Sequence, residues 1–238
     1  MKIDTLESTL IGLIETGKIG DENHKLPSEP QLMAQFGVTR YTLREALKRL
    51  RAQGYIFQSQ GRGVFVRRGN LSNYLSIQET AGLSDDLGRR GHSLETKSVE
   101  IRHTTATNAL FQPESITLDP EERLIEVNRL RYVDGAPYSK ELAYYIEKIV
   151  PEIPKSAAQD SIFKFLRTQY HLNTGFADKI ISSDHLPDQF AKELELPEGS
   201  PALIVHDEAY LTSGKLFNYS CVYYKFDRVK LFTYAKMR

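Results

Sequence analysis

The chain has 238 residues, of which 40% are hydrophobic and 26% charged, a balance typical of soluble globular proteins with one or two domains. It has no apolar run long enough to cross a membrane and no signal-peptide pattern, so we expect a cytoplasmic protein. Its single cysteine excludes an internal disulfide and a cysteine zinc cluster. The net charge is zero, but residues 40–68 contain eight basic residues and one acid, which indicates a polyanionic partner for that block alone.

The first part of the chain predicts helices separated by clear end signals. Apolar residues recur at helical spacing from Ile3 to Ile14 and predict the first helix. Ser28 is a natural N-cap, and Gln31 stands at the capping-box position three residues later, so a second helix begins there. Gly37 ends this helix with a left-handed turn.

A third helix and a hairpin complete this domain. Thr39 caps a helix that we expect to reach about Gln53, with its leucine and alanine residues facing the core. Two short strands follow, and Gly61-Arg62-Gly63 joins them in a tight, positively charged turn. This order of elements predicts a winged helix-turn-helix domain over residues 1–68.

The third helix and the hairpin tip present side chains that suit duplex DNA. A major groove admits one helix, and the arginine fork matches the paired acceptors of guanine. A helix N-terminus attracts phosphate, and an arginine between glycines can approach the minor groove closely. A solvated basic helix is the alternative, but the turn, the caps and the basic tip together favour DNA. The expected DNA contacts are Ser28, Thr39, Arg40, Tyr41, Thr42, Arg44, Gly61, Arg62 and Gly63.

The rest of the chain predicts a linker and a second domain. Residues 69–79 are polar and without periodicity, and we expect them to form the linker. Residues 80–238 predict an α+β domain on a mostly antiparallel sheet, with one hairpin turning at Asp134-Gly135 and another near Gly214. Residues 229–234 are expected to close this sheet.

Three motifs in the first domain resemble the GntR family of bacterial transcriptional regulators. They are LPSE at residues 26–29, FGVTRYTLREAL at 36–47 and QGRGVFV at 60–66. The resemblance implies that Arg40 and Arg44 contact operator DNA. Many members carry an arginine directly after the PSE triplet, whereas Pro30 stands there in this chain. We therefore expect the operator or the affinity to differ.

The second domain resembles the effector-binding UTRA domain of the HutC branch of this family, whose fold is similar to chorismate lyase. The matching motifs are RLRYVDG at residues 129–135, SIFKFL at 161–166 and LFNYS at 216–220. Within the branch, the chain is most similar to the sugar-responsive repressors of trehalose and β-glucoside operons. The resemblance implies a repressor released by a phosphorylated sugar, trehalose 6-phosphate or a phospho-β-glucoside. Proteins of this kind bind palindromic half-sites of double-stranded DNA as homodimers.

A small anion is expected to bind near two arginines of this domain. Arg129 and Arg131 share one strand face, and their guanidiniums repel each other unless a carboxylate or an anion such as phosphate lies between them. A helix beginning near residue 80 would direct the backbone amides of Ala81, Gly82 and Leu83 at the same anion.

The resemblance adds four residues to this effector site. Ser161 supplies a hydroxyl, while Glu141 and Tyr224 match an acid and an aromatic residue of the sugar pocket. Asn218 stands where amino-sugar-responsive members have glutamate, which favours neutral sugar hydroxyls. The alternative is that Arg129 forms only a surface salt bridge with Glu141 or Glu126, which would contribute little.

Other functions remain open at this point, with less support. A non-sugar anionic metabolite would suit the same arginines. A lyase-like enzyme is the less favoured alternative, because the sequence has no nucleophile elbow, phosphate-binding glycine loop, metal cluster or catalytic triad. We therefore expect no catalytic residue, metal or cofactor. A DNA-architectural protein is disfavoured because residues 71–238 contain 20 basic and 24 acidic residues.

Overall fold

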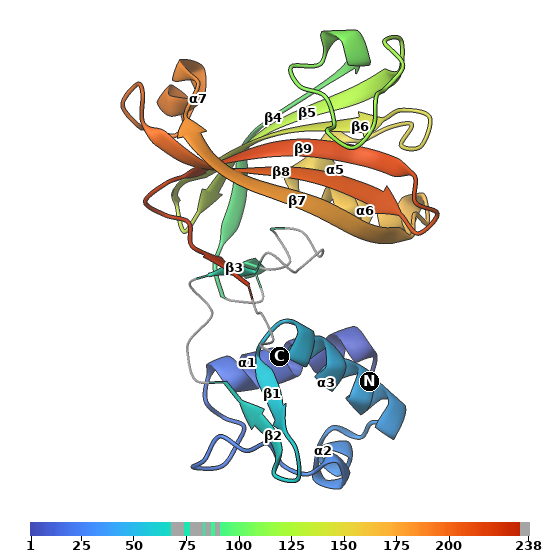
Figure 1. Cartoon of the computed structure of the whole chain (residues 1–238), viewed down its shortest axis with the longest axis vertical. Helices are drawn as coiled ribbons and strands as arrows, with labels where there is room; N and C mark the ends of the chain where they lie inside the picture. Colours follow the sequence, from blue (N-terminus) through green and yellow to red (C-terminus); the bar gives the residue numbers. More distant parts are fainter. Residues whose placement is uncertain (68–73, 77–82, 84–86, 89–90, 234–238) are drawn as a thin grey trace. The chain divides into compact units, whose positions relative to one another are not determined.

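The protein folds into two compact units (Figure 1). The computed structural model describes residues 1–67, 74–76, 83, 87–88 and 91–233. The first unit contains Met1–Glu79, Asp86–Gly91 and Lys230–Arg238, and the second contains Thr80–Asp85 and His92–Val229. Most of the helix expected over residues 80–90 lies outside the described residues. None of the described helices is long and apolar enough to cross a membrane.

The first unit is the winged helix that the sequence predicts. Its elements are α1 (Ile3–Glu15), α2 (Glu29–Phe36), α3 (Arg40–Ala52), β1 (Ile56–Ser59) and β2 (Gly63–Val66), with β1 and β2 antiparallel. The predicted caps are present. Gln31 Oε1 accepts a hydrogen bond from Ser28 N at 2.9 Å, and Thr39 Oγ1 accepts one from Thr42 N at 3.2 Å. Gly37 has φ +60°, the left-handed conformation that ends α2.

Helices α1 and α3 hold the core of this unit together. Leu6 and Leu10 from α1 pack with Leu43 and Leu50 from α3, and all four are buried. A polar clamp runs beside this contact. Arg49 Nη1 donates to Asp4 Oδ1 at 2.7 Å and to Glu7 Oε2 at 3.0 Å, and Gln53 Nε2 donates to Glu7 Oε1 at 2.8 Å. The clamp therefore satisfies a nearly buried carboxylate, that of Glu7.

The second unit is built on a six-stranded antiparallel sheet with the strand order β4-β5-β6-β9-β8-β7. The strands are β4 (Leu94–Thr105), β5 (Arg123–Val133), β6 (Ala136–Ile146), β7 (Thr174–His185), β8 (Pro201–Leu211) and β9 (Leu216–Lys225). A short 3-10 helix, η1 (Ala106–Asn108), follows β4. The β5–β6 hairpin turns at Asp134-Gly135 as predicted, with positive φ at both residues.

Helices cover both faces of this sheet. The helices α5 (Lys155–Gln159) and α6 (Ile162–Gln169) lie behind the sheet in Figure 1, and their apolar residues share a core with Val127 and Ala143. The helix α7 (Asp188–Glu193) packs through Phe190 against Leu130 and Ile204, on the opposite face. Alternation along β5 explains the division, because Val127 and Leu130 point to different faces.

The last strand does not close the sheet, so that prediction is wrong. The strand β10 (Leu231–Phe232) pairs in parallel with β3 (Leu75–Ser76), within the first unit. Leu75 N donates to Lys230 O at 2.8 Å, and the Arg67 guanidinium lies 5.8 Å from the centre of the Phe232 ring. A hydrogen-bonded partner and a cation–π contact thus bind the returning chain to the segment that follows the wing.

The clamp at Glu7 predicts a stability effect. Arg49→Ala should lower the free energy of unfolding of the first unit by about 1–2 kcal/mol, because it leaves the Glu7 carboxylate with fewer donors. Arg51→Ala is the matched control, since Arg51 is exposed on the same helix, and should cost less than about 0.5 kcal/mol. Urea unfolding followed by circular dichroism measures both variants. Equal stabilities for the two variants would show that the clamp contributes nothing.

Candidate functional site

The first turn of α3 exposes the side chains that the sequence predicts for DNA. Arg40, Tyr41 and Arg44 are exposed, Thr42 is half-buried, and Thr39 caps the helix. They lie together because residues three and four apart share a helix face, while the buried leucines occupy the other face. The turn combines the N-terminus of a helix with hydroxyl and guanidinium groups, which suits a polyanion.

Arg44 is held in place by α2. Its Nε lies 3.1 Å from both carboxylate oxygens of Glu29, the first residue of α2. Both side chains are solvent-accessible, so this pair contributes little to stability but restricts the orientation of the arginine. Ser28, immediately before Glu29, is exposed, and Pro30 occupies the first turn of α2. The residue that interrupts the family motif therefore lies beside the predicted contacts.

The tip of the wing requires its glycines. Gly61 has φ +70° and Gly63 has φ +120°, conformations that other residues rarely adopt. Between them, Arg62 is exposed. The backbone thus turns tightly and carries an exposed arginine at its tip, and the groove contact stays a prediction.

Arg129 and Arg131 of the second unit both contact one carboxylate, on the face of the sheet that α5 and α6 cover. Arg129 on β5 lies directly opposite Glu141 on β6, and its Nη2 is 2.5 Å from Glu141 Oε1. Arg131 Nε is 3.3 Å from Glu141 Oε2. Only 4% of Arg129 and 3% of Arg131 is exposed. The pairing of Arg129 with Glu141 is confirmed, but it is buried, not the surface bridge considered above.

Burial and charge oppose each other in this group. Burial favours the neutral form of Glu141, yet attraction to Arg129 and Arg131 holds the pKa of its carboxyl below the ordinary value. Burial, together with repulsion from Arg129, lowers the pKa of Arg131 to about 10. All three groups are therefore charged at neutral pH, and Glu141 occupies the position between the guanidiniums that an anion would fill.

One residue near the end of α5 contacts Arg129, and the next helix, α6, begins after Ser161. Arg129 Nη1 donates to Ala158 O at 3.2 Å, which fixes the arginine against the end of α5. Ser161 caps α6, is nearly buried, and its Oγ accepts a hydrogen bond from Lys164 N at 3.4 Å. Leu83 is half-buried, whereas Ala81 and Gly82 lie outside the described residues.

The register places Tyr224 opposite Ser139 and Asn218 opposite Tyr145, both on the face of the sheet that carries Glu141. The pKa of Tyr224 is raised well above its ordinary value, chiefly by burial, and Arg131 and Glu141 are among the charges that act on it. Asn218 lies opposite Tyr145, four residues along β6 from Glu141, a strand length of about 14 Å. Its Nδ2 donates to Tyr144 O at 3.0 Å.

Tyr145 also lies within reach of the charges of Arg129 and Glu141, and it is not among the residues predicted from the sequence. This tyrosine is buried, and Arg129 and Glu141 are the charges that act most on its hydroxyl after burial itself. Its position four residues after Glu141 places it on the same strand face, which was the available signal.

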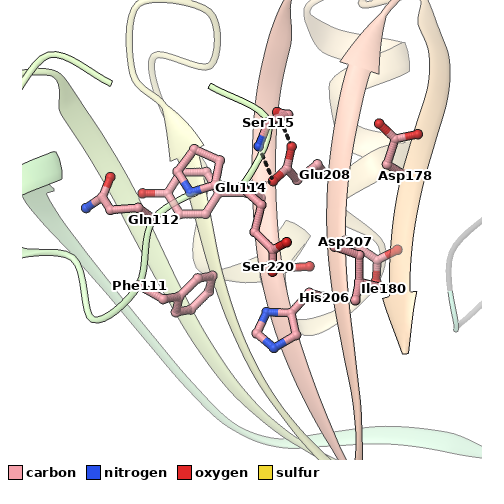
Figure 2. A pocket seen from close by; sticks show the side chains of 12 residues that line it. Phe111, Gln112, Glu114, Ser115, Asp178, Ile180, His206, Asp207, Glu208 and Ser220 are labelled. Atoms are coloured by element: carbon pink, nitrogen blue, oxygen red, sulfur yellow. Dashed lines mark hydrogen bonds between the residues drawn. The ribbon is translucent and has the colours of Figure 1, made fainter. Parts of the chain in front are cut away.

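A pocket of about 240 Å³ opens on β8 and β9 beside the loop of residues 111–115, as Figure 2 shows. Glu208 anchors this loop, accepting hydrogen bonds from Glu114 N at 2.5 Å, from Ser115 N at 3.2 Å and from the Ser115 hydroxyl. These bonds hold the pKa of the Glu208 carboxyl below its ordinary value even though burial acts to raise it. The described lining residues include none of those expected to bind the effector.

Comparisons with known proteins agree with this geometry. Residues 3–66 match the model of the "Bacterial regulatory proteins, gntR family", and residues 89–230 match the model of the "UTRA domain". The crystal structure of the possible transcriptional regulator YydK from Bacillus subtilis superposes with a TM-score of 0.77 at 28% identity. The superposition covers 99% of this chain and all of that one.

Named relatives are transcriptional regulators. The HTH-type transcriptional regulator YydK of Bacillus subtilis is 30% identical over 87% of this chain and 86% of its own length. The HTH-type transcriptional regulator TreR of the same organism is 26% identical over 99% of this chain and 97% of its own length. The mannosyl-D-glycerate transport/metabolism system repressor MngR of Escherichia coli is 26% identical over 82% of this chain and 80% of its own length. The chain belongs to the GntR family of DNA-binding transcriptional regulators with a UTRA effector domain, and not to a family of enzymes.

Proposed function

We propose that the protein is a cytoplasmic repressor of a carbohydrate-utilisation operon, released from DNA by a phosphorylated sugar such as trehalose 6-phosphate or a phospho-β-glucoside. The observation that carries the proposal is the buried pair Arg129 and Arg131, bridged by Glu141. The name of the relative MngR, which refers to a sugar derivative, supports the sugar class. The arginines alone would accept other anions, so a non-sugar metabolite is the second candidate.

The effector would act by exchange of one anion for another. In the structure, the Glu141 carboxylate supplies the negative charge that two buried guanidiniums require. A phosphate offers more oxygens and forms bidentate bonds to arginine, so it can take the place of the carboxylate. Glu141 is then free to accept hydrogen bonds from sugar hydroxyls. Glu141 would thus balance the charge of the two arginines when no effector is bound. It would accept hydrogen bonds from the sugar when the effector is bound.

DNA binding would rest on the first turn of α3 and the wing tip. Arg40 and Arg44 enter the major groove, where arginine discriminates guanine, and Arg62 reaches the minor groove. Thr39 and Ser28 bind phosphates through their hydroxyls and the adjacent helix amides. Effector binding weakens this complex if it favours an arrangement of the two recognition helices that no longer fits the half-sites, a coupling of about 1–3 kcal/mol.

A homodimer through β7 would bring two recognition helices to a palindromic operator. Strand β7 lies at the edge of the sheet, spans 12 residues and exposes Phe176, Ile180 and Ile181. A long edge strand with exposed apolar side chains invites pairing with another chain, and a second copy satisfies both edges at once.

The DNA assignment predicts a position-dependent loss on α3. Arg44→Ala should weaken operator binding by about 10- to 100-fold, since a bidentate arginine contact contributes about 1–3 kcal/mol. Arg51→Ala removes the same charge from the far end of α3 and should weaken binding much less. Gel-shift titrations with the protein's own promoter, at constant salt, compare the two. Equal losses would contradict the assignment of the first turn to the bases.

The effector assignment predicts a ligand-dependent thermal shift. The Tm is measured at increasing concentrations of trehalose 6-phosphate, a phospho-β-glucoside and N-acetylglucosamine 6-phosphate. An effector should raise the free energy of unfolding by about 2.7 kcal/mol at a hundredfold excess over its Kd, and the Tm rises with it. Arg129→Ala should abolish the shift and keep promoter binding. Arg167→Ala, which removes an exposed arginine from α6, should keep both. A full shift in Arg129→Ala would place the effector elsewhere, and shifts with non-sugar anions alone would favour the second candidate.

The dimer surface predicts that one residue controls the oligomeric state. Ile180→Lys should convert dimers to monomers, because lysine on an edge strand discourages pairing. Ile116→Lys is the matched control, since Ile116 is 42% exposed in a loop and Ile180 is 45% exposed on β7. Sedimentation equilibrium distinguishes the species. Dimers in both variants would exclude β7 as the contact.

A further inference from the structure

Ser139 on β6 is a buried serine whose hydroxyl has no role within the described structure. None of the residue is exposed, and its Oγ has no hydrogen-bond partner among the described residues. A buried hydroxyl without a partner lowers stability, because it loses its bonds to water and gains none in return. An alanine at this position would serve the fold better, so a partner that arrives later is the simplest reason for a serine.

The strand register places this hydroxyl beside the arginine pair. Ser139 lies directly opposite Arg131 on β5 and directly opposite Tyr224 on β9. Side chains of residues directly opposite each other in an antiparallel pair point to the same face, with their Cβ atoms about 4.5–5.5 Å apart. Glu141 follows two residues later and shares this face. The orphan hydroxyl thus lies between an arginine and a tyrosine of the proposed effector site.

A second orphan lies on the same face. Arg129 Nε is buried and has no partner among the described residues, although the two terminal nitrogens of its guanidinium are bound. The Arg129 Nε–H and the Ser139 hydroxyl are therefore two hydrogen-bond donors without a partner among the described residues. Both lie on the strand face that carries the Glu141 carboxylate. An anion with several acceptor oxygens would satisfy both, whereas a neutral apolar ligand would satisfy neither.

We propose that Ser139 is an effector-contacting residue whose hydroxyl donates a hydrogen bond to an oxygen of the bound phosphoryl group, beside Arg131. This inference rests on the anion site of the proposed function and extends it by one residue. It accounts for the presence of a serine at this position despite its cost to the stability of the protein without ligand. It also means that Ser139 favours ligands with a phosphoryl group over the corresponding unphosphorylated sugars.

The variant Ser139→Ala separates this role from a structural one. Its affinity for inorganic phosphate and for trehalose 6-phosphate, measured by calorimetry on the full chain, should fall by about 10- to 100-fold, the usual effect of one hydrogen bond to a charged group. The Tm of the ligand-free variant should stay equal or rise, because no bond is lost. Ser220→Ala is the matched control: Ser220 is also buried on this sheet, four residues from Tyr224, and the variant should bind within about twofold of the wild type.

Three other outcomes would overturn the inference. Unchanged affinity in Ser139→Ala, with strong binding by the wild type, would remove Ser139 from the site and leave the proposed function intact. A fall in affinity together with a lower Tm of the ligand-free variant would show that Ser139 has a structural role. If the wild type bound neither inorganic phosphate nor any phosphorylated sugar, the proposed function would fail, and this inference would fail with it.

Discussion

The buried guanidiniums of Arg129 and Arg131 lie on one face of the sheet, and the Glu141 carboxylate pairs with both of them. The second unit depends on this carboxylate to balance their charge. A buried charge is tolerated only when it is paired and hydrogen-bonded. The β5–β6 register sets Glu141 opposite Arg129, and the end of α5 provides Ala158 O as a further acceptor. The sheet and its covering helices thus form a site that requires negative charge. Because either the protein or a ligand can supply that charge, the same interaction can serve stability and sensing.

The winged helix was predictable because its signals are local. Ser28, Gln31, Thr39 and Gly37 act on backbone groups within a few residues of themselves, so their spacing alone locates the helix ends. The pairing of β10 with β3 has no such signal. A parallel pair joins segments more than 150 residues apart in the numbering, and two-residue strands carry no periodicity, so residues 229–234 were assigned to the wrong sheet.

The candidate effector site was predictable in part. Alternation along β5 placed Arg129 and Arg131 on one face, and the structure adds the depth of their burial, which turns a surface salt bridge into a buried one. Asn218 was grouped with them by resemblance, and the register sets it opposite Tyr145, on the same face as Glu141 and four residues further along the strands. Ser139 could not be singled out, because an unsatisfied hydroxyl becomes visible only when every neighbouring strand is in place.

The central claim is that Glu141 occupies the place of the effector's phosphate. Calorimetric titration of inorganic phosphate into the wild type and into Glu141→Gln tests it most directly, with promoter binding as the check that the variant is folded. If the carboxylate competes with the anion, its removal should raise the affinity for phosphate by about tenfold or more, because two buried guanidiniums lose their only bridging charge among the described residues. Equal or weaker binding of phosphate by Glu141→Gln would contradict the exchange.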